Sequence, residues 1–165
     1  MSELLEVVNE RGEVIGKAYR HECHGNPELA HCTAHVVVWS SSGDLLLQKR
    51  SEKKDMFPGK WDTAVGGHLA PGETYEVAAR REMEEELGVP APETLPRVCD
   101  LRVRNDWESE HVRVFSMTHD GPFYPPPEEI EELAFWSCDS LVKNMGTGIF
   151  TPNLETELQH IVLDS

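Results

Sequence analysis

Short apolar runs separated by turn residues dominate the first half of the chain. Runs at 4–8 and 13–19 flank the tetrad Asn-Glu-Arg-Gly, which predicts a β-hairpin near the N-terminus. A β-branched run, a Ser/Gly turn and a leucine run predict a second hairpin over 35–50. Further strands are expected at 63–65, 97–103, 111–117 and 134–138.

The strongest helical pattern lies between Thr74 and Gly88. One apolar stripe recurs at helical spacing and consists of Tyr75, Ala79, Met83 and Leu87. Thr74 suits the N-cap, and Gly88 suits the left-handed position just past the C-terminus. Glycines at 66, 67 and 72 predict a turn that brings backbone close to the start of this helix. Segments 139–146 and 152–163 are also expected to be helical.

Strands interspersed with a few helices predict an α/β layered domain. The chain has 165 residues and shows no internal repeat, low-complexity tract or linker, so we expect one domain over 1–165. The formal net charge of −15 argues against a nucleic-acid polymer as partner, because no basic face could dominate that field. No apolar run approaches the roughly 20 residues of a membrane span.

The N-terminal segment has no basic stretch before an apolar one, so no secretory signal is visible and a cytoplasmic location is expected. The cysteines form no CxxC pair, and reduced thiols are the expectation in that compartment. Cys99 and Cys138 are expected to be buried as small hydrophobic side chains.

Three carboxylates share one flank of the central helix. Glu82, Glu85 and Glu86 fall at i, i+3 and i+4, where like charges repel one another. Composition alone favours an ordinary solvated acidic face. Arg81 lies inside the acidic run, where it can orient a carboxylate, and hard oxygen ligands suit Mg²⁺ or Mn²⁺.

The full spacing of this segment matches a known signature. Residues 67–89 fit GX5EX7REUXEEXGU at every specified position, with U a bulky apolar residue, and thereby resemble the Nudix family. The resemblance implies an α/β/α sandwich with a mixed sheet, and metal-dependent hydrolysis of a diphosphate linkage in a nucleoside diphosphate-type or related substrate. It also implies that Mg²⁺ or Mn²⁺ binds Glu82, Glu85, Glu86 and the Gly67 carbonyl. Glu82 or Glu85 would then orient or deprotonate the attacking water, and Arg81 would hold the glutamates in position.

Much of the chain, over about residues 4–118, also resembles isopentenyl-diphosphate isomerase, which is built on the Nudix fold. The positions that match its metal ligands are His24, His31, His68, Glu108 and Glu110. Imidazoles with carboxylates suit Mn²⁺, Zn²⁺ or Fe²⁺ better than Mg²⁺, so a second, transition-metal site is implied. For each histidine alone, a polar surface side chain is the alternative.

Two basic residues match the isomerase's diphosphate contacts. Arg50 can grip a phosphate with paired hydrogen bonds, and Lys54 can act as a point charge. A basic hairpin end at the surface is the alternative. The isomerase has a cysteine where this chain has Gly66, which has no proton to exchange, and an aromatic residue where this chain has Asn153.

The sequence therefore favours a Nudix-type hydrolase acting on a small-molecule diphosphate. Glu108 and Glu110 are candidates for an acid supplied by a later loop, and Glu110 is included among the catalytic residues. An isomerase and a non-catalytic nucleotide-sensing module are the rival functions. The Nudix resemblance also implies a homodimer.

Four aromatic residues could take part in substrate binding. We expect them in the core, with stacking on a nucleobase as the alternative: Trp61, Trp107, Phe123 and Tyr124.

Overall fold

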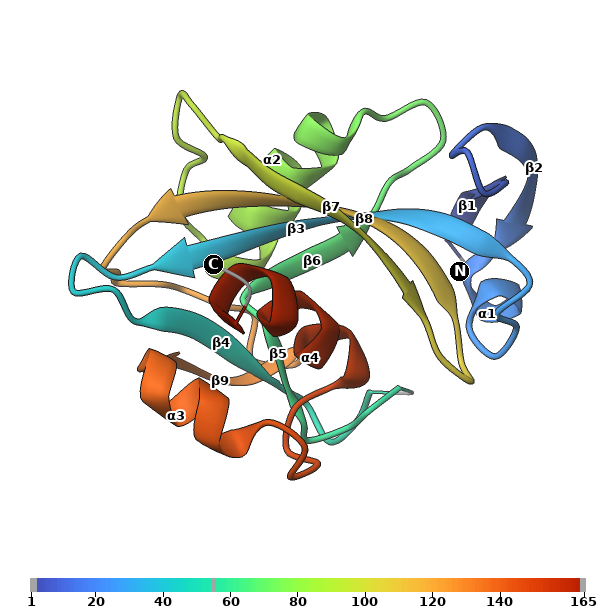
Figure 1. Cartoon of the computed structure of the whole chain (residues 1–165). Coiled ribbons are helices and arrows are strands. Elements are labelled where there is room, and N and C mark those ends of the chain that lie inside the picture. Colours follow the sequence, from blue (N-terminus) through green and yellow to red (C-terminus); the bar gives the residue numbers. More distant parts are fainter. Residues whose placement is uncertain (1–2, 55, 164–165) are drawn as a thin grey trace.

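The computed structural model describes residues 3–54 and 56–163. The elements, labelled in Figure 1, are β1 (Leu4–Val8), β2 (Val14–Tyr19), α1 (Arg20–Cys23), β3 (Ala30–Trp39), β4 (Leu45–Arg50), β5 (Trp61–Thr63), β6 (Val65–His68), α2 (Tyr75–Leu87), β7 (Arg97–Arg104), β8 (Ser109–Thr118), β9 (Ile130–Trp136), α3 (Cys138–Asn144) and α4 (Pro152–Leu158). A π-helical segment, Gln159–Leu163, continues α4. None of the helices in these two ranges is both long and apolar enough to cross a membrane.

Strand β3 connects the parts of a mixed sheet. It runs parallel to β8 along its whole length, from the pair Ala30 and Ser109 to the pair Trp39 and Thr118. On its other side it pairs antiparallel with β6, and it also contacts β1 near its start and β4 at its end. The N-terminal hairpin of β1 and β2 forms as the sequence predicts. The mixed sheet with helices confirms the expected α/β class.

Alternation along the central strands divides the apolar residues between two cores. Val36 and Val38 of β3 face α2 in one cluster, whereas Val37 packs with residues of α3 and α4 in the other. Strand β4 repeats the division, since Leu46 belongs to the first cluster while its neighbours belong to the second. Figure 1 shows α2 on one side of the sheet and α4 on the other. Helices therefore cover both faces, as the implied sandwich requires.

Helix α2 begins and ends at the residues that the sequence indicates. The Thr74 side chain accepts a hydrogen bond from the backbone of Val77, and Gly88 adopts a left-handed conformation with φ of 67°. Ala79, Met83 and Leu87 of the predicted stripe are fully buried against the sheet. These interactions fix both the length of α2 and the rotation of its acidic flank.

Several local expectations are wrong. Gly66 and Gly67 lie within β6 instead of forming a turn, and only Gly72 of the three glycines has a positive φ. The last strand begins at Ile130, four residues before the expected start at 134, because the acidic segment pairs with β4. Cys138 is exposed at the first residue of α3, where it faces solvent instead of the core.

A buried ion pair joins α4 to the central strand. His35 Nδ1 lies 2.5 Å from Glu157 Oε2, and the two side chains are 8% and 1% exposed. Burial alone would lower the pKa of His35, but the charge and hydrogen bond of Glu157 outweigh it and raise that pKa to about 9. The protonated imidazole is therefore stabilised in the folded state relative to the unfolded one.

This pair predicts how stability changes with pH. Its contribution is fully present below the ordinary histidine pKa of 6.5 and is lost as the pH rises through about 9. We expect the free energy of unfolding of the wild type, relative to Glu157→Gln, to fall by on the order of 2 kcal/mol across that interval. Urea unfolding of both proteins at several pH values measures the difference. A difference that does not vary with pH would show that the pair is not charged.

Candidate functional site

One cleft of about 550 Å³ brings together residues from both sequence resemblances. Its acidic lining consists of Glu3, Asp62, Glu82, Glu86, Glu108, Glu110 and Glu129. The basic residues that line it are Arg20, Arg50 and Lys54. Like charges gathered in a partly buried cleft repel one another more strongly than they would in water. The cleft is thus suited to binding cations, and an anion would bind only after cations had neutralised part of this negative charge.

Sheet register assembles a histidine–glutamate cluster at one end of the cleft. His31 of β3 lies directly opposite Glu110 of the parallel strand β8, and His68 at the end of β6 pairs with Thr33. His24 directly follows α1, and Glu108 lies in the turn before β8. Glu110 therefore belongs to a strand, and the expectation that it lies on a loop is wrong.

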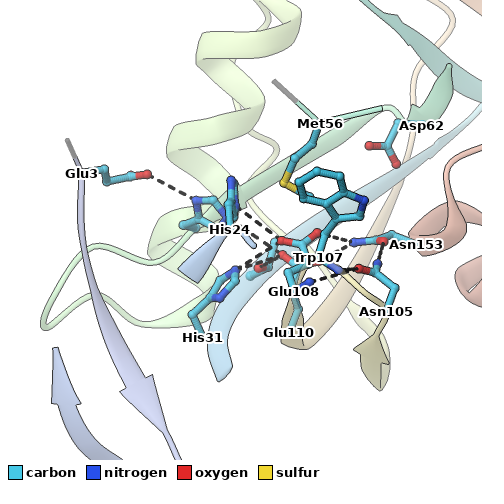
Figure 2. A network of polar contacts seen from close by, with 12 residues as sticks. Glu3, His24, His31, Met56, Asp62, Asn105, Trp107, Glu108, Glu110 and Asn153 are labelled. Carbon is cyan, nitrogen blue, oxygen red and sulfur yellow. Dashed lines mark hydrogen bonds and ion pairs between the residues drawn. The ribbon is translucent and has the colours of Figure 1, made fainter. Parts of the chain in front are cut away.

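The ligand atoms of this cluster lie close together, and Figure 2 shows His24 and His31 directed toward Glu108 and Glu110. Glu108 Oε2 lies 3.4 Å from His24 Nε2 and 3.7 Å from His31 Nε2. Glu110 Oε2 lies 3.5 Å from His31 Nε2 and 4.0 Å from His68 Nε2. Donor atoms bound at about 2.1 Å to one metal ion are separated by about 3.0–4.2 Å. Ligand atoms of His24, His31, His68 and Glu108 all lie within 4.8 Å of one another, which is compatible with one metal ion after small side-chain adjustments. Glu110 adjoins this group, because its Oε2 lies within 4.0 Å of two of the histidines.

Polar neighbours hold the side chains of the cluster by hydrogen bonds to their outer atoms and to one inner oxygen, Glu110 Oε2. Asn153 donates hydrogen bonds to Glu108 Oε1 at 3.0 Å and to Glu110 Oε1 at 2.7 Å. Thr33 donates to Glu110 Oε2 at 2.5 Å. His68 Nδ1 lies 3.3 Å from Glu3 Oε1, which leaves His68 Nε2 directed at the cluster. Such contacts orient metal ligands and set the tautomer of a histidine.

The charges of the cluster also fit a cation. Burial, followed by the neighbouring Glu110, raises the pKa of Glu108 to about 7. Burial alone would raise the pKa of Glu110 as well, but His31 holds it below its usual range. The ring nitrogens of the buried His31 make no hydrogen bond of good geometry among the described residues, although Cys23 and Glu110 lie close enough to raise the pKa of that ring. A divalent ion would satisfy these nitrogens and separate the two carboxylates.

Helix α2 contributes two carboxylates to the same cleft. Glu86 is held by the backbone N–H of Gly66 at 3.1 Å and by Gln48 Nε2 at 3.3 Å. Glu82 passes so close to Gly67 that a β-carbon on that residue would lie 2.1 Å from its carboxyl carbon. Glu85 does not line the cleft: its side chain is 61% exposed, and its nearest cation is Arg81 at 3.7 Å. Glu85 as a metal ligand therefore stays a prediction.

Arg81 forms hydrogen bonds that connect α2 with the loop before it and with the end of β6. It donates two hydrogen bonds to Glu73, at 3.0 and 2.8 Å, and one to Glu82 at 2.6 Å. A further bond of 3.2 Å reaches the carbonyl of His68. Arg81 thus links Glu82 to the end of β6, an arrangement compatible with the orienting role that stays a prediction.

Burial changes the protonation of both cleft-facing helix carboxylates. It raises the pKa of Glu82 to about 7, despite the adjacent Arg81 guanidinium. It also raises the pKa of Glu86 well above its usual range, and the charge of Glu82 adds to this effect. Carboxylates of this kind bind a metal ion in exchange for protons.

The two predicted phosphate contacts lie in the cleft wall. Arg50 donates from Nε to the carbonyl of Met56 at 2.9 Å, and its Nη1 lies 3.5 Å from Asp62. Lys54 lines the same wall. Both are placed where they could counter the charge of a bound phosphate.

Sequence reasoning missed other residues of the cleft. Glu129, Gln48, Asp62 and His35 all line it. Glu129 is part of an acidic run that resembles a solvated segment, and His35 lies in an apolar strand run, so local pattern gave no signal for either. The expectation of buried aromatic residues is wrong for Trp107 and Tyr124, which are 50% and 68% exposed.

Comparison with known proteins places these features in a family. The model of the NUDIX domain matches residues 30–153. An uncharacterized Nudix hydrolase of Yersinia pestis is 36% identical over 154 residues, which cover 92% of this chain and 81% of that protein. Isopentenyl-diphosphate Delta-isomerase of Corynebacterium diphtheriae is 30% identical over 173 residues, with coverage of 98% and 94%.

A solved structure supports the same assignment. The crystal structure of DR0079 from Deinococcus radiodurans superposes with a TM-score of 0.78 at 28% identity, and the match covers 90% of this chain and 92% of that one. The resemblance inferred from the signature over 67–89 is therefore confirmed. This chain belongs to the Nudix hydrolase family.

Proposed function

We propose that this protein hydrolyses a phosphoanhydride bond of a nucleoside diphosphate-type or related organic diphosphate, with divalent metal ions held on α2. The observation that carries the proposal is the convergence of Glu82 and Glu86 in an acidic cleft beside Arg50 and Lys54. An anionic substrate would be repelled by the carboxylates lining this cleft unless cations neutralised them. Mg²⁺ or Mn²⁺ suits these oxygen ligands.

The residues take separate roles in this proposal. Glu82, Glu86, the Gly67 carbonyl and, after a side-chain rotation, Glu85 would hold the ions. When bound, such ions supply Lewis acidity to the phosphoryl oxygens and neutralise developing charge. Glu82 would orient or deprotonate the attacking water, for which a pKa of about 7 is well suited. Arg81 positions Glu82, and Arg50 and Lys54 contact the phosphates.

The histidine–glutamate cluster would hold a second metal ion of the transition series. His24, His31, His68, Glu108 and Glu110 are its proposed ligands, and the mixture of imidazole with carboxylate suits Mn²⁺, Zn²⁺ or Fe²⁺. Glu110 is also a candidate acid toward the substrate, because it lines the cleft. Its four neighbours in the cluster leave it better placed as a ligand than as a proton carrier.

The helix carboxylates make the hydrolysis testable. With Mg²⁺ and a panel of nucleoside diphosphates, nucleotide sugars and prenyl diphosphates, we expect Glu82→Gln and Glu86→Gln to lower kcat/KM by on the order of 100-fold or more, because each loses a charged ligand. Product analysis by mass spectrometry gives the bond that is cleaved. Glu84→Gln is the matched control, since Glu84 is exposed on the same helix. Equal activity of all four proteins would remove α2 from the mechanism.

Removing ligands of the cluster should release its metal. We expect elemental analysis of the purified protein to find a transition metal, and His31→Gln or Glu108→Gln to lose it. Asn153→Leu should weaken metal affinity by about 10–100-fold, because it frees the outer oxygens of both glutamates. His160→Gln, at an exposed position of the C-terminal segment, serves as the control. Metal content that is the same in every variant would contradict the proposed ligand set.

Isomerisation of isopentenyl diphosphate is the second candidate, because the five-ligand cluster matches that relative. Gly66 argues against it: a β-carbon there would lie 3.0 Å from His35, so even the start of a cysteine side chain is crowded. In D₂O we expect no deuterium to enter isopentenyl diphosphate, as measured by mass spectrometry. Incorporation of deuterium without diphosphate release would favour the isomerase instead.

A further inference from the structure

The floor of the cleft contains a histidine that the proposed hydrolysis leaves without a role. His35 is 6% exposed and lines the cleft from the middle of β3. Its Nδ1 lies 2.5 Å from Glu157 Oε2, and Glu157 itself is 1% exposed on α4. Because a carboxylate can only accept at this distance, Nδ1 carries a proton and the ring is held in one orientation.

The opposite edge of the ring faces the cleft wall beside Gly66. A β-carbon built on Gly66 would lie 3.0 Å from His35 Cδ2 and 3.1 Å from Nε2. The neighbouring strand therefore places no side chain over this edge. Gly66 also donates its backbone N–H to Glu86, and Gly67 passes next to Glu82. His35 Nε2 thus lies beside Gly66, the residue whose backbone N–H holds Glu86, and His35 lines the same cleft as the histidine–glutamate cluster.

The surroundings favour a ring with protons on both nitrogens. Glu157 provides a full negative charge at one edge, and Glu110 and Asp62 add to the same field. A histidine protonated on both nitrogens has no lone pair for a metal ion and can only donate. In a cleft whose lining carboxylates would bind metal ions, a phosphate oxygen of a bound diphosphate is a charged acceptor that suits such a donor.

We propose that His35 is a substrate contact, whose Nε2–H donates a hydrogen bond to a phosphate oxygen of the bound diphosphate. Glu157 is the positioning residue that holds the ring for this contact. The inference rests on the proposed function for the identity of the ligand. It assigns a second recognition point for the diphosphate, on the part of the sheet next to Gly66, in the cleft that the helix carboxylates and the histidine–glutamate cluster also line.

The test measures binding directly. In the presence of Mg²⁺, isothermal titration with methylenediphosphonate, which cannot be hydrolysed, compares wild type with His35→Phe and His35→Gln. We expect His35→Phe to weaken binding by about 10-fold or more, because a hydrogen bond to a charged acceptor is lost. His35→Gln retains an N–H donor and should stay within about threefold of wild type. Equal binding by wild type and His35→Phe would overturn the proposal.

The positioning role of Glu157 has its own readout. Glu157→Gln should raise KM by a larger factor than it lowers kcat. The substitution lets the His35 ring leave the orientation in which Nε2–H reaches the substrate, while the helix carboxylates stay intact. A purely structural role would instead lower the amount of folded enzyme and leave KM unchanged. His160→Gln is again the control, with both parameters expected at wild-type values.

Two further comparisons separate folding and function from this contact. His35→Phe leaves Glu157 unpaired in the core, which could destabilise the fold. The double variant His35→Phe/Glu157→Leu removes both partners and is therefore measured as well. Binding of methylenediphosphonate at wild-type strength by the double variant also overturns the proposal. If wild type binds methylenediphosphonate through His35 but hydrolyses no diphosphate, the proposed function fails while the contact stands. If wild type hydrolyses diphosphates and His35→Phe binds the analogue equally well, the contact alone fails.

Discussion

The register of β3 between β6 and β8 is the constraint on which the site depends. It places His31 opposite Glu110, Thr33 opposite His68 and His35 opposite Gly66. Side chains alternate between the faces of a sheet, so a slip of one residue would move this whole row to the face covered by α2. The valines at 36, 37 and 38 prevent such a slip, because each face has its own buried core. Packing that stabilises the fold therefore also assembles the site.

Charge is the second organising element. The polar side chains of His31, Thr33 and His35 lie on β3, a well-packed strand, where burying an unpaired charge is costly. The structure offsets that cost in two ways. Some groups are paired directly, as Glu157 with His35 and Glu73 with Arg81. Others, in the cluster and on α2, line one cleft together, where their charges are only partly offset by protein groups. This second set is the one to which we assign metal binding in the proposed function.

How much could be predicted from sequence depends on whether a feature is local. The caps of α2 and its apolar stripe follow from spacing within one element, and they are found as expected. The sequence predicts that Gly66 and Gly67 form a turn that brings backbone close to α2. The close approach is found, by Glu86 and Glu82, but it occurs within a strand, because the pairing of β6 with β3 depends on tertiary packing. The exposure of Glu85 and the place of His35 likewise depend on how α2 and α4 are rotated against the sheet.

This chain is similar over most of its length to an uncharacterized Nudix hydrolase and to an isopentenyl-diphosphate Delta-isomerase. The sequence resemblance to the isomerase rests in part on residues of the histidine–glutamate cluster, whereas the Nudix signature lies on α2 and just before it. The His35 ring borders the space next to residue 66, and a β-carbon on that residue would lie 3.0 Å from the ring. In this chain His35 reaches into that space from β3, and Gly66 leaves it open. The proposed Nε2–H donor would complement a phosphate oxygen there, whereas it would offer nothing to an apolar carbon skeleton. A side chain on residue 66 would compete with His35 for this space, so under the proposal the glycine favours a phosphate contact over a catalytic group supplied from β6.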